Sequence, residues 1–251
     1  MLNYKKFYSL IVVSTIFVLC TYPVFKPYLT IIDKIAMMSN IDIESIFKNT
    51  HHYALSHVSK QSFCVTYSIP FLLYLVCALP TEKNEYCLRI NSREKILKKR
   101  RQHIIVVVSI FTIIFTFIDS SFMMIIFPIH HLIQNEYFIY LLYHGLNMAL
   151  FYGFIGMLYL IVNDYIKHTI KSVVITYIII AGSYFLIYRI FELDIWNIVR
   201  DIGLFGMLTS GVIDLQVANY YLFNQLLLVS FSCLISHAIF LKKDMIYNEK
   251  K

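Results

Sequence analysis

The sequence predicts an all-α integral membrane protein with six transmembrane helices. Hydrophobic residues make up 59% of the 251 positions and charged residues 15%, whereas soluble domains carry about a quarter charged residues. The mean hydropathy is +0.66, and the apolar residues form runs of about 20, the length that crosses the hydrocarbon core of a bilayer. Counts of 7 Gly and 5 Pro exclude collagen-like and low-complexity chains.

Six segments are long and apolar enough to be spans. The first run passes through Tyr22, Pro23 and Val24 without a small-residue cleavage site, which favours an uncleaved helix over a signal peptide. Pro70 interrupts the second run, and a span tolerates proline where neighbouring helices satisfy the freed carbonyl. No linker or repeat divides the chain, so residues 1–251 form a single transmembrane domain. The predicted spans are about 7–25, 63–80, 104–127, 137–162, 170–190 and 220–241.

Basic residues predict the orientation of these spans. With the N-terminus in the cytoplasm, 16 Lys and Arg fall on the inner side and 6 on the outer side. Cytoplasmic connections are enriched in Lys and Arg. We therefore expect a multi-pass protein of the cell membrane with both termini cytoplasmic, and the net charge of +7 indicates orientation rather than nucleic-acid binding.

The basic inner loop 81–103 carries the strongest polar pattern. Residues 92–101 predict a short helix, because the Ser92 hydroxyl can accept an early backbone N–H as N-cap. Ile96 and Leu97 would give this helix a small apolar contact, and the KKRR run would lie at its end, where cations suit the helix dipole. One interpretation is a topology anchor that touches anionic lipid. The other is a docking helix for a cytoplasmic partner, and the two are compatible.

The outer loop 26–62 has apolar residues at a helical period, which predicts short amphipathic helices on the membrane surface. Histidines lie in this loop and after the third span. A structural zinc site needs about four ligands at ordered spacing, which these histidines lack, so we expect solvated side chains and no metal. They are His51, His52, His57, His130 and His131.

The last outer loop, 191–219, is too apolar for a free loop and too broken for a full span. Gly203, Gly206 and Gly211 interrupt its pattern. Short interfacial or re-entrant helices are the natural interpretation, since non-helical backbone at membrane depth must be surrounded by protein or a water-filled cavity. The alternative makes 202–219 part of a longer sixth helix.

Asp119 is the one carboxylate that lies well inside a predicted span. An ionised carboxylate at a helix centre costs roughly 2.5–3.5 kcal/mol on insertion scales, so such a residue normally faces the bundle interior and has a partner. His144 and Asn147 on the fourth span are the candidate partners. The group could be a structural hydrogen-bond network or a polar patch in a transport path.

Other side chains in the spans predict packing rather than chemistry. Gly145, Ala149 and Gly153 lie along one helix face, where small residues let another helix approach, either within the chain or at a dimer seam. The 20 Tyr and 20 Phe spread over every span and are interpreted as lipid-facing and interfacial filling. The cysteines are interpreted as small hydrophobes without a disulfide framework; they are Cys20, Cys64, Cys77, Cys87 and Cys233.

Several catalytic patterns are missing from the sequence. It contains no G-x-x-x-x-G-K-[ST], H-E-x-x-H, G-x-S-x-G or C-x-x-C. We therefore expect no enzyme activity and no cofactor in this chain, and any ATP hydrolysis would belong to a partner subunit.

The layout resembles the permease subunits of type-two ABC exporters, notably the small Gram-positive permeases of bacteriocin or peptide export and immunity. The resemblance covers nearly the whole chain and rests on six spans with both ends inside, the basic segment between spans two and three, and the broken helices before the last span. It implies re-entrant helices at about 194–218. It also implies an ATPase-coupling segment, which would consist of Arg89, Ser92, Arg93, Glu94, Lys95, Ile96, Leu97 and Lys98.

The resemblance also implies partners and a role. The chain would pair with a second permease subunit, as a homo- or heterodimer, and with a cytoplasmic ABC ATPase subunit, surrounded by membrane lipid and without nucleic acid. Because the spans offer few charged groups to bind a hydrophilic solute, the expected cargo is an amphipathic peptide or lipid-like molecule. The alternative is a non-transporting membrane protein, such as a bacteriocin immunity factor or the scaffold of a membrane complex.

Overall fold

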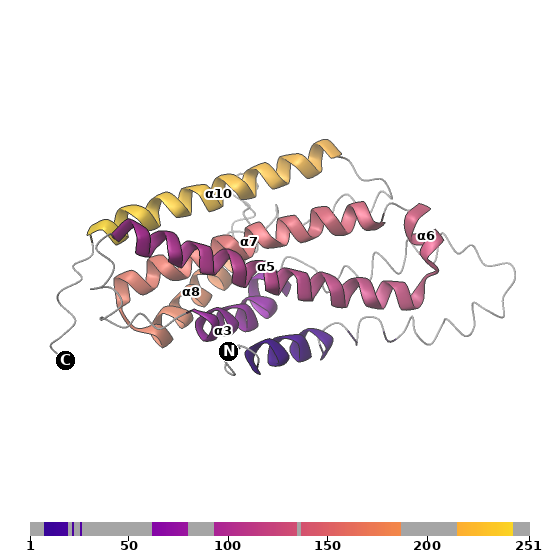
Figure 1. The fold of residues 1–251 in the computed structure, drawn as a ribbon, viewed down its shortest axis with the longest axis horizontal. Helices are drawn as coiled ribbons and strands as arrows, with labels where there is room; N and C mark the ends of the chain where they lie inside the picture. The colour runs from indigo at the N-terminus through magenta and orange to yellow at the C-terminus, as the bar shows by residue number, and fades with distance from the viewer. Residues whose placement is uncertain are drawn as a thin grey trace, which may run out of the picture.

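The protein is described by a computed structural model over residues 8–19, 22, 26, 62–79, 93–134, 137–186 and 215–242. The described parts are helices joined by short turns and contain no strand, which confirms the all-α class (Figure 1). The elements in chain order are an apolar helix Tyr8–Leu19, the π-helix η1 (Ser62–Tyr67), α3 (Ser68–Ala78), α5 (Arg93–Ile126), α6 (Ile129–Gln134), α7 (Tyr137–Ile166), α8 (Thr169–Ser183) and α10 (Leu215–Lys242).

Four described helices are long and apolar enough to cross a membrane, and they match the last four predicted spans. The first two predicted spans correspond to shorter apolar helices among the described residues. The four long helices indicate a membrane-embedded protein. Their apolar stretches are Glu94–Ile126, Tyr137–Ile166, Thr169–Leu186 and Leu222–Phe240, and the shorter helices are Tyr8–Leu19 and Cys64–Ala78.

Helix α7 is the central element of the bundle. It packs against α5, α8 and α10, and more narrowly against α3. Its buried residues lie on several sides of the helix rather than on one stripe, as expected for a helix that is surrounded by others. Figure 1 shows α5, α7 and α10 running side by side over most of the length of the molecule.

Aromatic rings form much of the core where the first helices meet α5 and α7. Neighbouring ring centroids in this cluster lie 4.8 to 5.4 Å apart, mostly edge to face, a geometry that favours aromatic pairs. The interpretation of Tyr and Phe as lipid-facing filling was therefore wrong for these residues, because all of them are buried. They are Phe17, Tyr67, Phe71, Phe111, Phe115 and Tyr152.

Helix α5 corrects the predicted boundary of the third span. A separate short helix over 92–101 and a span from 104 were expected, but α5 is one helix of 34 residues from Arg93 to Ile126, about 51 Å long at 1.5 Å per residue. No Gly or Pro interrupts this stretch, and its charged start is rich in good helix formers. Pro128 then prevents continuation, because it cannot extend a helix from the preceding turn.

The turn between α7 and α8 consists of Lys167 and His168. Lys167 has a φ of 58°, a left-handed conformation that is uncommon outside glycine. The imidazole Nδ1 of His168 accepts the backbone N–H of Lys171 at 3.4 Å and so caps α8. This short turn brings α8 back against α7.

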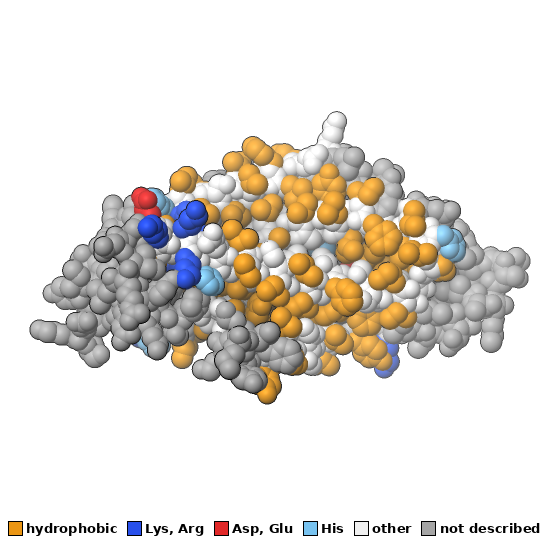
Figure 2. All heavy atoms as spheres, in the orientation of Figure 1, with side chains coloured by type: hydrophobic (Ala, Val, Ile, Leu, Met, Phe, Trp, Pro, Cys, Tyr) orange, Lys and Arg blue, Asp and Glu red, His pale blue; other side chains and the backbone are white. Residues whose placement is uncertain are grey.

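The surface divides by polarity. On the face shown in Figure 2, apolar side chains cover the middle of the molecule, and Lys, Arg and Glu gather near one end. That end, called the basic end below, is where α5 begins and α10 ends (Figure 1). The last outer loop, 191–219, lies outside the described residues apart from the start of α10 at Leu215.

Candidate functional site

A buried ion pair joins α5 to α7 at the basic end. Arg100 Nη1 donates to Asp164 Oδ2 at 2.9 Å, and Nη2 donates to Oδ1 at 3.0 Å. The arginine side chain is 8% exposed and the aspartate side chain 0%. Two parallel charge-assisted bonds fix the angle between the groups as well as their distance. The pair therefore keeps the first turns of α5 next to the last turn of α7.

Helix α10 contacts this ion pair at the basic end. The guanidinium carbon of Arg100 lies 5.0 Å from the ring centroid of Phe240, within the range of a cation–π contact. Phe240 also forms a buried apolar cluster with Ile96 and Leu97. We call these five residues the basic-end clamp: Arg100, Asp164, Phe240, Ile96 and Leu97. Arg101 adds a second link, since its Nη2 donates to the Cys233 carbonyl at 2.6 Å.

The predicted coupling segment divides between the clamp and the surface. Ile96 and Leu97, expected to offer an apolar contact to a partner, are instead buried against the chain's own Phe240. Arg89 and Ser92 lie outside the described residues, and Arg93 begins α5. The exposed members are Glu94, Lys95 and Lys98, followed by the exposed Lys99.

Asp164 is the functional candidate that sequence reasoning missed. It lies 64 residues from Arg100 in the chain, so no local spacing connects the two. The only signal in the sequence was a carboxylate at the end of an apolar run, next to Asn163. Burial of Asp164 in the last turn of α7 then requires a cation from a neighbouring helix.

The predicted intramembrane polar residues are buried on two helices that pack together, Asp119 on α5 and His144 and Asn147 on α7. Tyr137 and Tyr140 of α7 lie within electrostatic range of Asp119. The His144 ring stacks on Tyr140 with centroids 5.5 Å apart and an interplanar angle of 16°. We call Asp119, Tyr137, Tyr140 and His144 the Asp119 cluster. Asn147 is buried nearly one turn farther along α7.

The glycines of α7 allow close approach to its neighbours within the chain. A Cβ on Gly156 would lie 2.7 Å from Ile104 Cγ2 of α5, and one on Gly145 would lie 3.3 Å from Thr116 Cγ2. A Cβ on Gly153 would lie 3.9 Å from Val229 Cγ2 of α10. The predicted small-residue face therefore serves intrachain contacts at Gly145 and Gly153.

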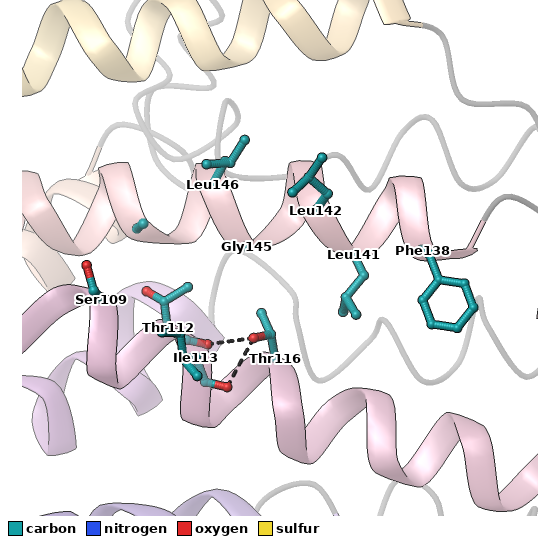
Figure 3. A pocket seen from close by; sticks show the side chains of 10 residues that line it. Ser109, Thr112, Ile113, Thr116, Phe138, Leu141, Leu142, Gly145 and Leu146 are labelled. Carbon is teal, nitrogen blue, oxygen red and sulfur yellow. Dashed lines mark hydrogen bonds between the residues drawn. The ribbon is translucent and has the colours of Figure 1, made fainter.

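An open groove of about 440 Å³ lies between α5 and α7 (Figure 3). Its α7 wall includes the small residues Gly145 and Ala149, and its rim carries apolar side chains. Its α5 wall carries three hydroxyl groups. We call it the α5–α7 groove, lined by Ser109, Thr112, Ile113, Thr116, Phe138, Leu141, Leu142, Gly145, Leu146 and Ala149.

Within the described ranges, no three His, Cys, Asp or Glu side chains gather closely enough to hold a metal ion, and Cys64, Cys77 and Cys233 are free thiols. The groups present hold helices together through an ion pair, a side-chain-to-backbone hydrogen bond and apolar packing. No family model, curated protein or solved structure matches this chain, so the proposals below depend on its residues and geometry.

Proposed function

We propose that this chain is the permease subunit of an ATP-driven exporter of the ABC type in the cell membrane. It would cross the membrane six times with both termini in the cytoplasm and carry re-entrant helices before the last span. A second permease subunit would complete the pathway, and a separate ATPase would bind at the basic end. The cargo is an amphipathic peptide or lipid-like molecule.

The observation that supports this proposal best is the continuity of α5. One uninterrupted helix carries exposed cations in its first turns and Asp119 in its far half. The separation is 20 residues from Lys99 to Asp119, about 30 Å along the axis. A helix without Gly or Pro bends little, so a force applied to its exposed start moves the wall of the α5–α7 groove.

The basic-end clamp would be the pivot of this movement. Because Arg100 is bonded to Asp164 and contacts Phe240, the start of α5 stays next to α7 and α10. An ATPase that closes on ATP would therefore turn α5 against α7 about the clamp. The arrangement changes at the opposite end, around the Asp119 cluster and the groove.

The contact with the ATPase must be mainly electrostatic, since the apolar residues of the coupling segment are buried. Lys95, Lys98 and Lys99 are exposed and follow the i, i+3, i+4 spacing of one helix face. The complementary surface is acidic. Its attraction falls with salt, because exposed charges are screened over about 8–10 Å at physiological ionic strength.

Purification of the full chain from its native membrane tests the proposal. We expect a nucleotide-binding ATPase to co-purify and to be released by the triple substitution Lys95→Gln, Lys98→Gln and Lys99→Gln. The matched control is Lys167→Gln with Lys171→Gln, which removes exposed lysines from the α7–α8 region and leaves binding unchanged.

Two outcomes would contradict the proposal. Purification without any ATPase would favour the non-transporting alternative, an immunity factor or scaffold. Equal loss of the ATPase in the triple variant and the control would show that binding depends on total charge and not on the exposed face of α5.

A further inference from the structure

The turn between α7 and α8 lies at a membrane surface when these two helices cross the bilayer. Both are long and apolar enough to span it, over Tyr137–Ile166 and Thr169–Leu186, and only Lys167 and His168 separate them. A connection of two residues is too short to leave the interfacial layer, which is about 5–7 Å deep on each side of the hydrocarbon core. The turn therefore lies among lipid headgroups, at the end of the molecule where α5 begins (Figure 1).

The exposed face of α8 passes directly from a cation to apolar side chains. A lysine in the first turn is followed at the i+3, i+4 and i+7 positions of the same face by exposed apolar residues. These residues are Lys171, Val174, Ile175 and Ile178. Tyr165, just before the turn, is 84% exposed, as is typical of tyrosine at a membrane interface. A lysine beside such a face holds its ammonium at the headgroups while its stem covers apolar surface.

The positive charge of this turn is not balanced within the described part of the chain. The first turn of α8 contains no acidic residue. Asp164, which lies close in sequence, is buried and bonded through both of its oxygens to Arg100. Lys167 and Lys171 are both exposed, and neither forms an ion pair with a described residue. The complementary ligand at this depth is therefore an anion.

The turn also supplies donors that suit a phosphate group. The exposed His168 accepts the backbone N–H of Lys171 with its Nδ1 at 3.4 Å, so the neutral ring carries its proton on Nε2. That N–H and two lysine ammonium groups can donate to phosphate oxygens. A headgroup with a negative phosphate and no cation fits this site, whereas the choline of phosphatidylcholine would place a third positive charge beside two lysines.

We propose that the α7–α8 turn binds the headgroup of an anionic phospholipid. Lys167, His168 and Lys171 donate to its phosphate, and its acyl chains lie along Val174 and Ile178. This site is separate from the exposed lysines of α5 that would bind the ATPase. The inference rests on the membrane crossing of the proposed function but needs neither ATPase nor transport, so the two can fail independently.

Photoreactive lipids test the occupant directly. The full chain is reconstituted in phosphatidylcholine vesicles that contain a trace of either photoreactive phosphatidylglycerol or photoreactive phosphatidylcholine, each labelled near the headgroup. Peptide mass spectrometry then maps the adducts. We expect phosphatidylglycerol adducts to concentrate on residues 165–171 and to be displaced by unlabelled phosphatidylglycerol. Inorganic phosphate at constant ionic strength should not displace them, because it lacks the acyl chains that hold the lipid on α8.

A pair of matched variants locates the site. Lys167→Gln with Lys171→Gln should weaken the preference for phosphatidylglycerol at the turn about 30-fold, since each lysine near an anionic membrane surface contributes about fivefold. The control is the triple substitution Lys95→Gln, Lys98→Gln and Lys99→Gln, which removes more charge but from α5, whereas α8 packs against α7, α3 and η1. We expect less than a twofold change there, so the two variants should have opposite effects on lipid and on ATPase binding.

Lys167→Gly separates binding from folding. Lys167 has a φ of 58°, a conformation that favours glycine at the end of a helix. The substitution should therefore leave the melting temperature unchanged or raise it, while the preference for phosphatidylglycerol falls about fivefold. A residue with a purely structural role would not show this combination.

Equal labelling of the turn by the two lipids would overturn the inference, as would displacement by inorganic phosphate. So would an unchanged lipid preference in Lys167→Gln with Lys171→Gln, or an equal loss in the α5 triple variant, which would show an effect of total charge. A phosphatidylglycerol adduct at the turn of a protein that purifies without an ATPase would keep this inference while contradicting the proposed function.

Discussion

The basic-end clamp gives the sharpest prediction about stability. In Arg100→Met or Asp164→Leu, one charge of a buried bidentate pair is left without its partner. Breaking a buried pair in this way typically costs about 3–5 kcal/mol. The 2.9 and 3.0 Å bonds and the 0% exposure of the aspartate side chain place this pair in that class. The double variant removes both charges, so we expect it to be more stable than either single variant.

Equilibrium unfolding in mixed micelles measures the three variants as a double-mutant cycle, which isolates the coupling between the two side chains. Lys99→Met is the control, because it removes an exposed charge one residue away and should change the free energy of unfolding by less than about 0.5 kcal/mol. The argument would be refuted if each single variant lowered the free energy of unfolding by less than about 1 kcal/mol and the two losses were additive in the double variant. That behaviour is typical of solvent-exposed ion pairs.

Three further substitutions test other contacts by thermal unfolding. Gly156→Ala should cost about 1–3 kcal/mol, because the new Cβ would lie 2.7 Å from Ile104 Cγ2. Gly182→Ala is the control and should be neutral or stabilising, because its Cβ would have nothing within 4 Å. Equal effects of the two substitutions would contradict the close packing at Gly156. Phe240→Ala should cost about 3–5 kcal/mol, because the ring is fully buried against Ile96, Leu97 and Arg100. An unchanged melting temperature would contradict this. Asp119→Leu should cost about 1–3 kcal/mol, because it removes a buried polar side chain from the polar groups around it, while Asp119→Asn should be milder. Equal stability of Asp119→Leu and wild type would contradict a structural role of Asp119.

Much of the helical layout could be predicted from the sequence, because a run of apolar residues is a local property. The start of α7 at Tyr137 agrees with the prediction. The start of α5 does not, because the charges before residue 104 suggested a separate short helix over 92–101 that ends before the span. The sequence does contain a helical pattern that crosses the predicted boundary at residue 104. It consists of buried residues three or four positions apart, namely Ile96, Arg100, Ile104 and Val107.

The candidate site could be predicted only in part, because its contacts are long-range. The pairing of Arg100 with Asp164 depends on how α5 and α7 cross, which neither segment encodes alone. Asp119 and His144 were expected to share a polar site, and the structure buries both of them, on the neighbouring helices α5 and α7. Tyr137 and Tyr140 were interpreted as lipid-facing but are buried too, since a tyrosine on an apolar helix has the same local pattern whether it faces lipid or the interior of the bundle.

The distance between α5 and α7 during ATP turnover tests the central claim most directly. Spin labels at Ile125 and Ile139 report on the end opposite the clamp, and labels at Gln102 and Tyr165 report on the basic end. All four positions are exposed. With the partner ATPase bound, trapping with ATP, magnesium and vanadate should move the first pair to a new distance and leave the second unchanged. Identical distances with and without ATP at both pairs, or a change at the basic end alone, would contradict the account.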